Sequence, residues 1–300
     1  MHTELQPQPA VRRRPFMLWI TLLRPKQWTK NLFVFSALLF SLKLLQWKDF
    51  FLTSAGFVIF CLISSCVYIL NDYADMEADR NHPEKRRRPL ASGQLSPAVA
   101  LRSGFLLLII ALCAAFYLDA AFGALVCGYF IINVVYSYRI KHVVIADIMT
   151  IALGFVIRAV SGGIIIHVPI TPWFLLCIML LALFLAIGKR RHEIVMMQHV
   201  DTQNNRRVLA FYSLPLLDQM NGMVTSAIIL CYTLFTFTSD QSVYLMWTIP
   251  FVLYGLFRYM YLVHIEKKGG SPEKLLLEDK HILLTVAGYV LTTVYILYFH

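Results

Sequence analysis

Three aspartates near one end of an apolar segment are spaced to share one face of a helix. Asp72, Asp75 and Asp79 follow one another at intervals of three and four residues, and Asn71 directly precedes them. On an α-helix these side chains lie within an arc of roughly 100°. Stacked carboxylates at a membrane boundary are costly unless they share a cation. The pattern predicts a magnesium site, because Mg²⁺ prefers oxygen ligands and combines carboxylates with substrate phosphates.

A basic run follows the aspartates after a few residues, with the sequence Lys85-Arg86-Arg87-Arg88-Pro89. Next to a magnesium site, these cations could bind the phosphate groups of an anionic substrate. The alternative is a loop whose positive charge only fixes the orientation of the chain in the membrane. The acidic face is harder to explain as an ordinary loop, because acids at the edge of a membrane are usually functional.

The composition indicates a membrane protein with many spans. Of the 300 residues, 58% are hydrophobic and only 15% are charged, whereas charged residues make up about 25% of a soluble domain. The net charge of +10 does not indicate nucleic-acid binding, because the basic residues occupy short loops between apolar segments. We therefore expect an all-α protein in the bilayer, with anionic ligands and no nucleic acid.

Nine apolar segments have about the length that a bilayer requires. The first is interrupted by polar residues 24–31, so it should begin as an interfacial helix, bend at Pro25 and then cross. We expect one transmembrane domain over residues 18–300, preceded by a cytoplasmic tail at 1–17; the sequence leaves the oligomeric state open, a homo-oligomer included. The segments are 18–42, 50–71, 97–117, 120–137, 144–166, 172–190, 222–238, 243–263 and 281–299.

Lysine and arginine alternate between the two sides of the predicted bundle. One side holds the amino terminus and the basic connections at 72–96, 139–141, 189–221 and 264–280, whereas the other offers only Lys43 and Lys48. Positive residues favour the cytoplasmic side. The amino terminus and the aspartates are therefore predicted to be cytoplasmic, in a bacterial-type inner membrane.

The fifth segment carries a polar stripe that should face the inside of the bundle. Its members are Asp147, Thr150, Gly154, Arg158, Ser161 and Gly162, all in one sector at helical spacing. This stripe predicts a polar central cavity, open to the cytoplasmic side. Arg158 lies about three turns, or roughly 16 Å, from Asp147, so the two side chains should not pair.

The acidic motif carries a resemblance to a known family. The pattern NDxxDxxxD from Asn71 to Asp79, followed by the run 85–93, resembles the first aspartate motif of the UbiA superfamily of intramembrane prenyltransferases. Within that superfamily, residues 24–31, 136–141, 154–158 and 188–193 make the chain most similar to the decaprenyl-phosphate phosphoribosyltransferases. Nine spans agree with that fold. The second aspartate-rich motif of the aromatic prenyltransferases is missing after the sixth segment, where Lys189, Arg190 and Glu193 stand instead.

The resemblance implies transfer of 5-phosphoribosyl from phosphoribosyl pyrophosphate to a polyprenyl phosphate. We expect Asp72, Asp75 and Asp79 to hold Mg²⁺ on the donor pyrophosphate, with Asn71 orienting them. The substrate-binding residues that the resemblance implies are Lys85, Arg86 and Arg88 for the leaving group, Lys189 and Arg190 for the donor 5-phosphate, Lys30 or Lys141 for the lipid phosphate, and Tyr136 and Glu193 for the sugar hydroxyls.

Two other functions remain open. An ordinary UbiA-type enzyme would use a polyprenyl diphosphate to alkylate an aromatic or glycerol-phosphate acceptor, and it would share the fold and the aspartate motif. A transporter would use Arg158 and Asp147 as pathway residues. Against a transporter, the charged cluster lies at one membrane face, and the chain has no pair of broken helices in matching halves.

Overall fold

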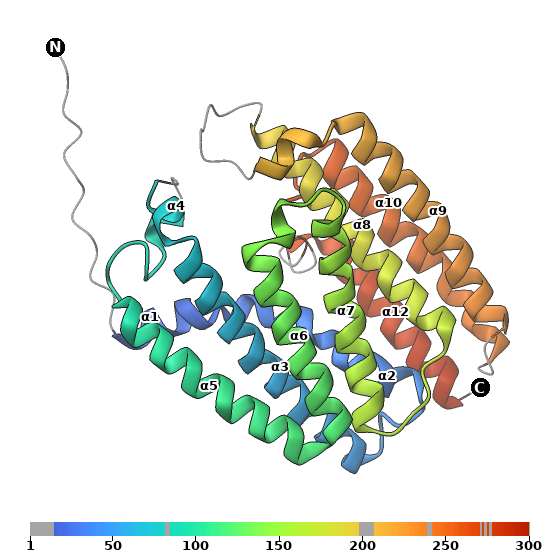
Figure 1. The fold of residues 1–300 in the computed structure, drawn as a ribbon. Helices are drawn as coiled ribbons and strands as arrows, with labels where there is room; N and C mark the ends of the chain where they lie inside the picture. The colour runs from blue at the N-terminus through green and yellow to red at the C-terminus, as the bar shows by residue number, and fades with distance from the viewer. Residues whose placement is uncertain are drawn as a thin grey trace.

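The computed structural model describes residues 15–81, 85–197, 207–238, 242–270 and 278–299, together with Pro272 and Leu275. Within these residues the regular structure is entirely helical, without a strand, and the helices form one bundle (Figure 1). This confirms the all-α prediction. Most of the predicted cytoplasmic tail lies outside the described residues.

Eight helical stretches in the described part of the chain are long and apolar enough to cross a membrane. Each matches one of the predicted segments to within a few residues, except that α8 ends seven residues after its segment and α9 begins eight residues before its segment. They are α3 (Trp47–Ala74), α5 (Pro97–Leu118), α6 (Ala120–Tyr138), α7 (Ala146–Ile165), α8 (Pro172–Met197), α9 (Leu214–Thr238), the continuous stretch of η5 (Val243–Thr248) and α10 (Ile249–His264), and α12 (Lys280–Phe299).

The first predicted span is broken into three pieces. It consists of α1 (Pro15–Leu23), the 3₁₀ helix η1 (Pro25–Phe35) and α2 (Ser36–Phe40). Arg24 separates the first two with a left-handed backbone at φ 53°, and Pro25 then starts η1, as a residue without an N–H can at a first turn. The predicted bend at Pro25 is confirmed. A long 3₁₀ helix was not foreseen, and it explains why the segment is not one continuous span.

Close backbone packing holds η1 inside the bundle. A Cβ atom added to Gly162 of α7 would lie 2.0 Å from the carbonyl oxygen of Val34, so only glycine lets the two backbones approach this closely. Val34 and Asn31 of η1 are both fully buried. As a result, the polar side chain of Asn31 lies in the interior of the membrane domain, next to α7.

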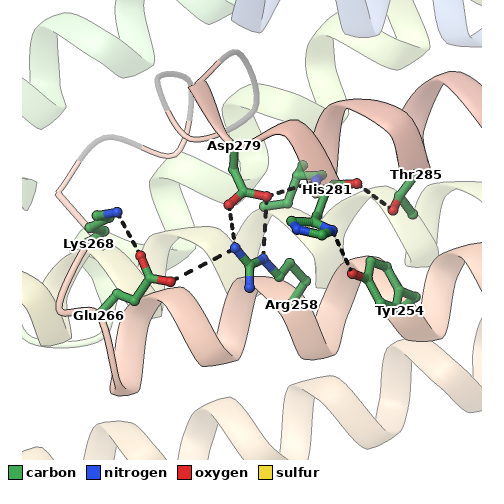
Figure 2. A network of polar contacts seen from close by, with 8 residues as sticks. Tyr254, Arg258, Glu266, Lys268, Asp279, His281 and Thr285 are labelled. Carbon is green, nitrogen blue, oxygen red and sulfur yellow. Dashed lines mark hydrogen bonds and ion pairs between the residues drawn. The ribbon is translucent and has the colours of Figure 1, made fainter.

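The connection between α10 and α12 is tied by charged residues (Figure 2). Arg258 donates to Asp279 over 2.7 Å, and Glu266 accepts from Lys268 over 2.6 Å. Asp279 also accepts the backbone N–H of Ile282 over 2.9 Å, which satisfies a donor in the first turn of α12. The hydrogen bonds from Arg258 lower the pKa of Asp279 below its ordinary value. These contacts close the last two helices into a hairpin.

Candidate functional site

The acidic motif lies where α3 ends and the short helix α4 (Met76–Arg80) begins. Asp75 separates the two helices, with φ −95° and ψ 7°. Its N–H bonds to the carbonyl of Asn71 over 2.9 Å, and the N–H of Asp79 bonds to the carbonyl of Asp75 over 2.8 Å. Because the helical hydrogen-bond pattern continues through this break, the aspartates keep the common face that their spacing predicted.

Asp72 and Asp79 converge on one cation. Nη1 of Arg88 lies 3.0 Å from Oδ1 of Asp72 and 2.5 Å from Oδ2 of Asp79. Arg24 also donates to Asp72, a role that the sequence analysis did not predict for it. Both carboxylates are almost completely buried, at 2% and 3% exposure. Two arginines therefore balance two carboxylates that would otherwise repel each other.

Asp75 turns to a different partner. Its Oδ1 atom accepts from Nζ of Lys141 over 2.8 Å, and Lys141 lies in η3 (Ile140–His142) between α6 and α7. In the described part of the chain, no three acidic, histidine or cysteine side chains group together as a metal site. The predicted set of three aspartates is thus divided between two basic partners, because Arg88 contacts Asp72 and Asp79 while Lys141 contacts Asp75.

The donor set nevertheless fits magnesium. Carboxylate oxygens of Asp72 and Asp79 already approach the same charged nitrogen, so both can contact a cation placed between them. Mg²⁺ in proteins usually takes one or two carboxylates and completes its shell with water and substrate phosphates. Asp72 and Asp79 would supply those two carboxylates, and Arg88 could then turn to the phosphates.

A second cluster lies at the end of α8. The guanidinium of Arg190 donates to Asp147 over 2.7 Å and to Tyr136 over 3.3 Å, and it also bonds to Glu193. Arg190 is only 1% exposed. The structure thus brings together Tyr136, Arg190 and Glu193, which were predicted to bind substrate, but the charge of Arg190 is already balanced by two carboxylates.

Tyr212 completes this cluster and was missed in the sequence. Its hydroxyl donates to Oδ1 of Asp147 over 2.7 Å and accepts the N–H of Ile145 over 2.7 Å. Burial, followed by the hydrogen bond to Asp147, raises the pKa of Tyr212, so it remains a protonated donor at neutral pH. Asp147 was identified in the polar stripe, but no spacing in the sequence connects Tyr212 to it.

The remaining predicted residues differ in exposure. Asn71 is half-buried and directly precedes Asp72, while Arg86 is exposed in η2 (Lys85–Arg87). The three other lysines are half-buried and each has an interaction of its own: Lys30, Lys85 and Lys189. Arg158 does not contact Asp147, in agreement with the prediction from their separation along α7.

Comparison with known proteins settles the family. The model of the UbiA prenyltransferase family matches residues 32–284. The chain belongs to this family. It is 31% identical to a protein of Mycolicibacterium smegmatis named decaprenyl-phosphate phosphoribosyltransferase, over 100% of this chain and 98% of that one. A protein of Corynebacterium glutamicum with the same name is 31% identical over 93% of this chain and 86% of its own.

Solved structures confirm the UbiA fold. A UbiA homolog from Archaeoglobus fulgidus bound to GPP and Mg²⁺ superposes with a TM-score of 0.72 at 18% identity, covering 93% of this chain and 99% of the homolog. The same homolog bound to DMAPP and Mg²⁺ gives a TM-score of 0.73 at 17% identity, covering 94% of this chain. As a UbiA protein with eight long apolar helices in its described part, the chain is an integral membrane protein.

Proposed function

We propose that this UbiA protein transfers a 5-phosphoribosyl group from phosphoribosyl pyrophosphate to a polyprenyl phosphate of the decaprenyl type, with release of pyrophosphate. The observation that carries the proposal is the end-to-end likeness to proteins named decaprenyl-phosphate phosphoribosyltransferase. The geometry agrees with it, since buried carboxylates and several basic side chains lie at one end of a membrane bundle. A donor rich in phosphate and a lipid acceptor could meet there.

The reaction needs little acid–base chemistry from the protein. An oxygen of the lipid phosphate attacks C1 of the ribose, and the bond from C1 to the pyrophosphate oxygen breaks. The attacking oxygen is already ionised at neutral pH, so no strong general base is required. The protein instead positions the two substrates and stabilises the charge on the leaving pyrophosphate.

The acidic cluster would hold the donor. Asp72 and Asp79, oriented by Asn71, would hold Mg²⁺, and the ion would supply positive charge for the pyrophosphate. Asp75 joins this set when Lys141 turns away. Lys85, Arg86 and Arg88 contact the pyrophosphate as it leaves. At the end of α8, Lys189 and Arg190 would bind the 5-phosphate, with Arg190 exchanging a carboxylate partner for it, and Tyr136 and Glu193 would contact the sugar hydroxyls.

We also propose an orientation in the membrane. The basic connections meet at one end of the bundle, because Lys141 contacts Asp75 and the N–H of Gly269 donates to His192 at the end of α8. At the opposite end, Lys43 contacts the carbonyl of Ile166 over 2.9 Å. Since basic connections favour the cytoplasm, the site opens to that side. The broken segment 15–40 serves as the ninth crossing, which leaves the amino terminus cytoplasmic.

The test is an assay with purified protein, radiolabelled phosphoribosyl pyrophosphate and polyprenyl phosphate. We expect a labelled lipid with Mg²⁺ and none with excess chelator. The second candidate is a prenyltransferase that uses a polyprenyl diphosphate, which is favoured by the fold shared with the homolog bound to GPP. Prenylation of an aromatic or glycerol-phosphate acceptor, without any labelled lipid from the first assay, would reverse the choice.

A further inference from the structure

Arg158 is a cation buried within the membrane bundle. Its side chain belongs to α7 and is only 5% exposed. Nε donates to Oδ1 of Asn31 over 2.7 Å, Nη1 to the carbonyl of Gly154 over 2.8 Å, and Nη2 to the hydroxyl of Tyr129 over 2.6 Å. The guanidinium also lies over the rings of Tyr129 and Phe155, at 4.7 Å and 5.3 Å from their centroids.

All three of these acceptors are neutral. In the part of the chain that the structure describes, no carboxylate forms an ion pair with Arg158, whereas the buried Arg190 contacts two. A guanidinium has five N–H groups, and the contacts above use one on each nitrogen. One N–H on Nη1 and one on Nη2 therefore remain for a further acceptor. A buried charge without a counter-ion is costly. An anionic ligand would supply both the counter-ion and the acceptors for the two remaining N–H groups.

The guanidinium points toward the end of the bundle that carries the acidic site. Nη1 bonds to the carbonyl of Gly154, which precedes Arg158 by one turn on the side of Asp147, so the side chain extends toward the end of α7 that carries Asp147. Asn31, which accepts from Arg158, also donates to Ser64 of α3 over 3.0 Å. Ser64 precedes Asp72 by eight residues, or about 12 Å along the helix. Arg158 is thus placed below the acidic site.

We propose that Arg158, with the hydroxyl of Tyr129, binds the phosphate of the polyprenyl phosphate acceptor. This inference rests on the proposed function and names the group that recognises the second substrate. The attacking oxygen must approach C1 from the side opposite the leaving pyrophosphate. With the pyrophosphate held at Asp72 and Asp79, a phosphate bound at Arg158, deeper in the bundle, could approach C1 from that opposite side.

The surroundings of Arg158 suit a phosphate that carries an apolar chain. Tyr129 lies in a buried cluster with Phe60 and Phe122, and Phe155 lies in another. The donor has charged groups at both of its ends, so burying it here would be costly. The polyprenyl phosphate has one charged end and an apolar chain, and burial of the chain would favour its binding.

Substitution of Asn31 separates a ligand-binding role from a structural one. Asn31→Asp is nearly isosteric and puts a carboxylate beside Nε of Arg158. The change also removes the amide N–H groups that Asn31 donates to Ser64 and Cys61, so the melting temperature does not decide between the roles. If Arg158 only ties α7 to η1, the new ion pair should leave KM for polyprenyl phosphate unchanged. If Arg158 binds the acceptor phosphate, the carboxylate will neutralise the site. We then expect KM for polyprenyl phosphate to rise at least tenfold, with KM for phosphoribosyl pyrophosphate unchanged.

Direct binding makes the result independent of turnover. The probes are farnesyl phosphate and its neutral counterpart farnesol, titrated into the full-length protein in detergent. We expect Asn31→Asp and Arg158→Gln to weaken binding of farnesyl phosphate at least tenfold and to leave farnesol unaffected. Arg102→Gln, which removes an exposed arginine of α5, is the matched control and should behave like the wild type.

The possible outcomes are distinct. Wild-type affinity of Asn31→Asp for farnesyl phosphate would overturn the proposal, even if Arg158→Gln failed to fold. Absence of any phosphoribosyl lipid from the wild type would instead overturn the proposed function. In that case, selective loss of farnesyl phosphate binding in the variants would still place a lipid phosphate at Arg158.

Discussion

The Nζ atom of Lys141 lies 2.8 Å from Oδ1 of Asp75, although 66 residues separate them in the sequence. This contact joins the connection between α6 and α7 to the turn between α3 and α4. It also occupies one of the three carboxylates that were expected to share a cation. A divalent ion at Asp75 would therefore have to compete with Lys141.

Removal of Lys141 should make the acidic site easier to load with magnesium. In Lys141→Met, Asp75 loses its counter-ion, so the concentration of Mg²⁺ that gives half-maximal activity should fall, by up to about fivefold for a partly exposed pair. Titration of phosphoribosyl transfer with Mg²⁺ measures this change. A higher magnesium requirement in the variant would show that Lys141 assists the metal site instead of competing with it.

Neutralisation of either buried aspartate should nearly abolish turnover. Asp72→Asn and Asp79→Asn each remove a charge that would hold the donor pyrophosphate, and we expect kcat/KM to fall about 100-fold or more. The control is Glu77→Gln on α4, because Glu77 is an exposed acid of the same short segment. Activity near that of the wild type in both aspartate variants would remove the acidic cluster from the mechanism.

The contact between Gly162 and Val34 predicts a large effect on stability. In Gly162→Ala the new Cβ would lie 2.0 Å from the carbonyl oxygen of Val34, so η1 must move away from α7. We expect the free energy of unfolding to fall by about 1–3 kcal/mol. Gly128→Ala is the control, since nothing lies within 4 Å of a Cβ added there. That variant should be neutral or stabilised by up to about 1 kcal/mol. Thermal unfolding in detergent compares the two.

Local spacing was enough to predict much of the fold and part of the site. The long apolar segments became helices, and the aspartates kept a common face because helical hydrogen bonds continue through Asp75. The polar stripe of α7 correctly separated Asp147 from Arg158. Each of these features depends on residues that are neighbours in sequence, which a helical period describes directly.

What the sequence could not show depends on contacts between distant segments. Arg24 reaches Asp72, and Asn31 reaches Arg158, only because η1 packs into the bundle as a 3₁₀ helix. Tyr212 reaches Asp147 across 65 residues. The choice of Lys141 as the partner of Asp75 is also a product of packing. No periodic pattern within one segment specifies such pairs, so these members of the two clusters were missed or given other roles.

The hydrogen bond between Tyr212 and Asp147 should make stability depend on alkaline pH. Burial and the bond to Asp147 raise the pKa of Tyr212 in the folded protein. In the unfolded chain the pKa of this tyrosine should be at its ordinary value of about 10. A raised folded pKa gives a contribution that is complete below the unfolded value and is lost as the pH rises above it. The wild type should therefore lose stability steeply above about pH 10.

Tyr212→Phe isolates this effect from other groups that titrate in alkali. At neutral pH the variant loses the donor to Asp147 and the acceptor for Ile145, so it should be less stable by about 1–3 kcal/mol. Above about pH 10 the difference from the wild type should shrink, because the variant has no proton to lose at this position. Melting temperatures from pH 8 to 11 test this, with Tyr117→Phe, which alters a tyrosine that is 92% exposed, as the control. A constant difference across that range would mean that Tyr212 does not couple its proton to folding.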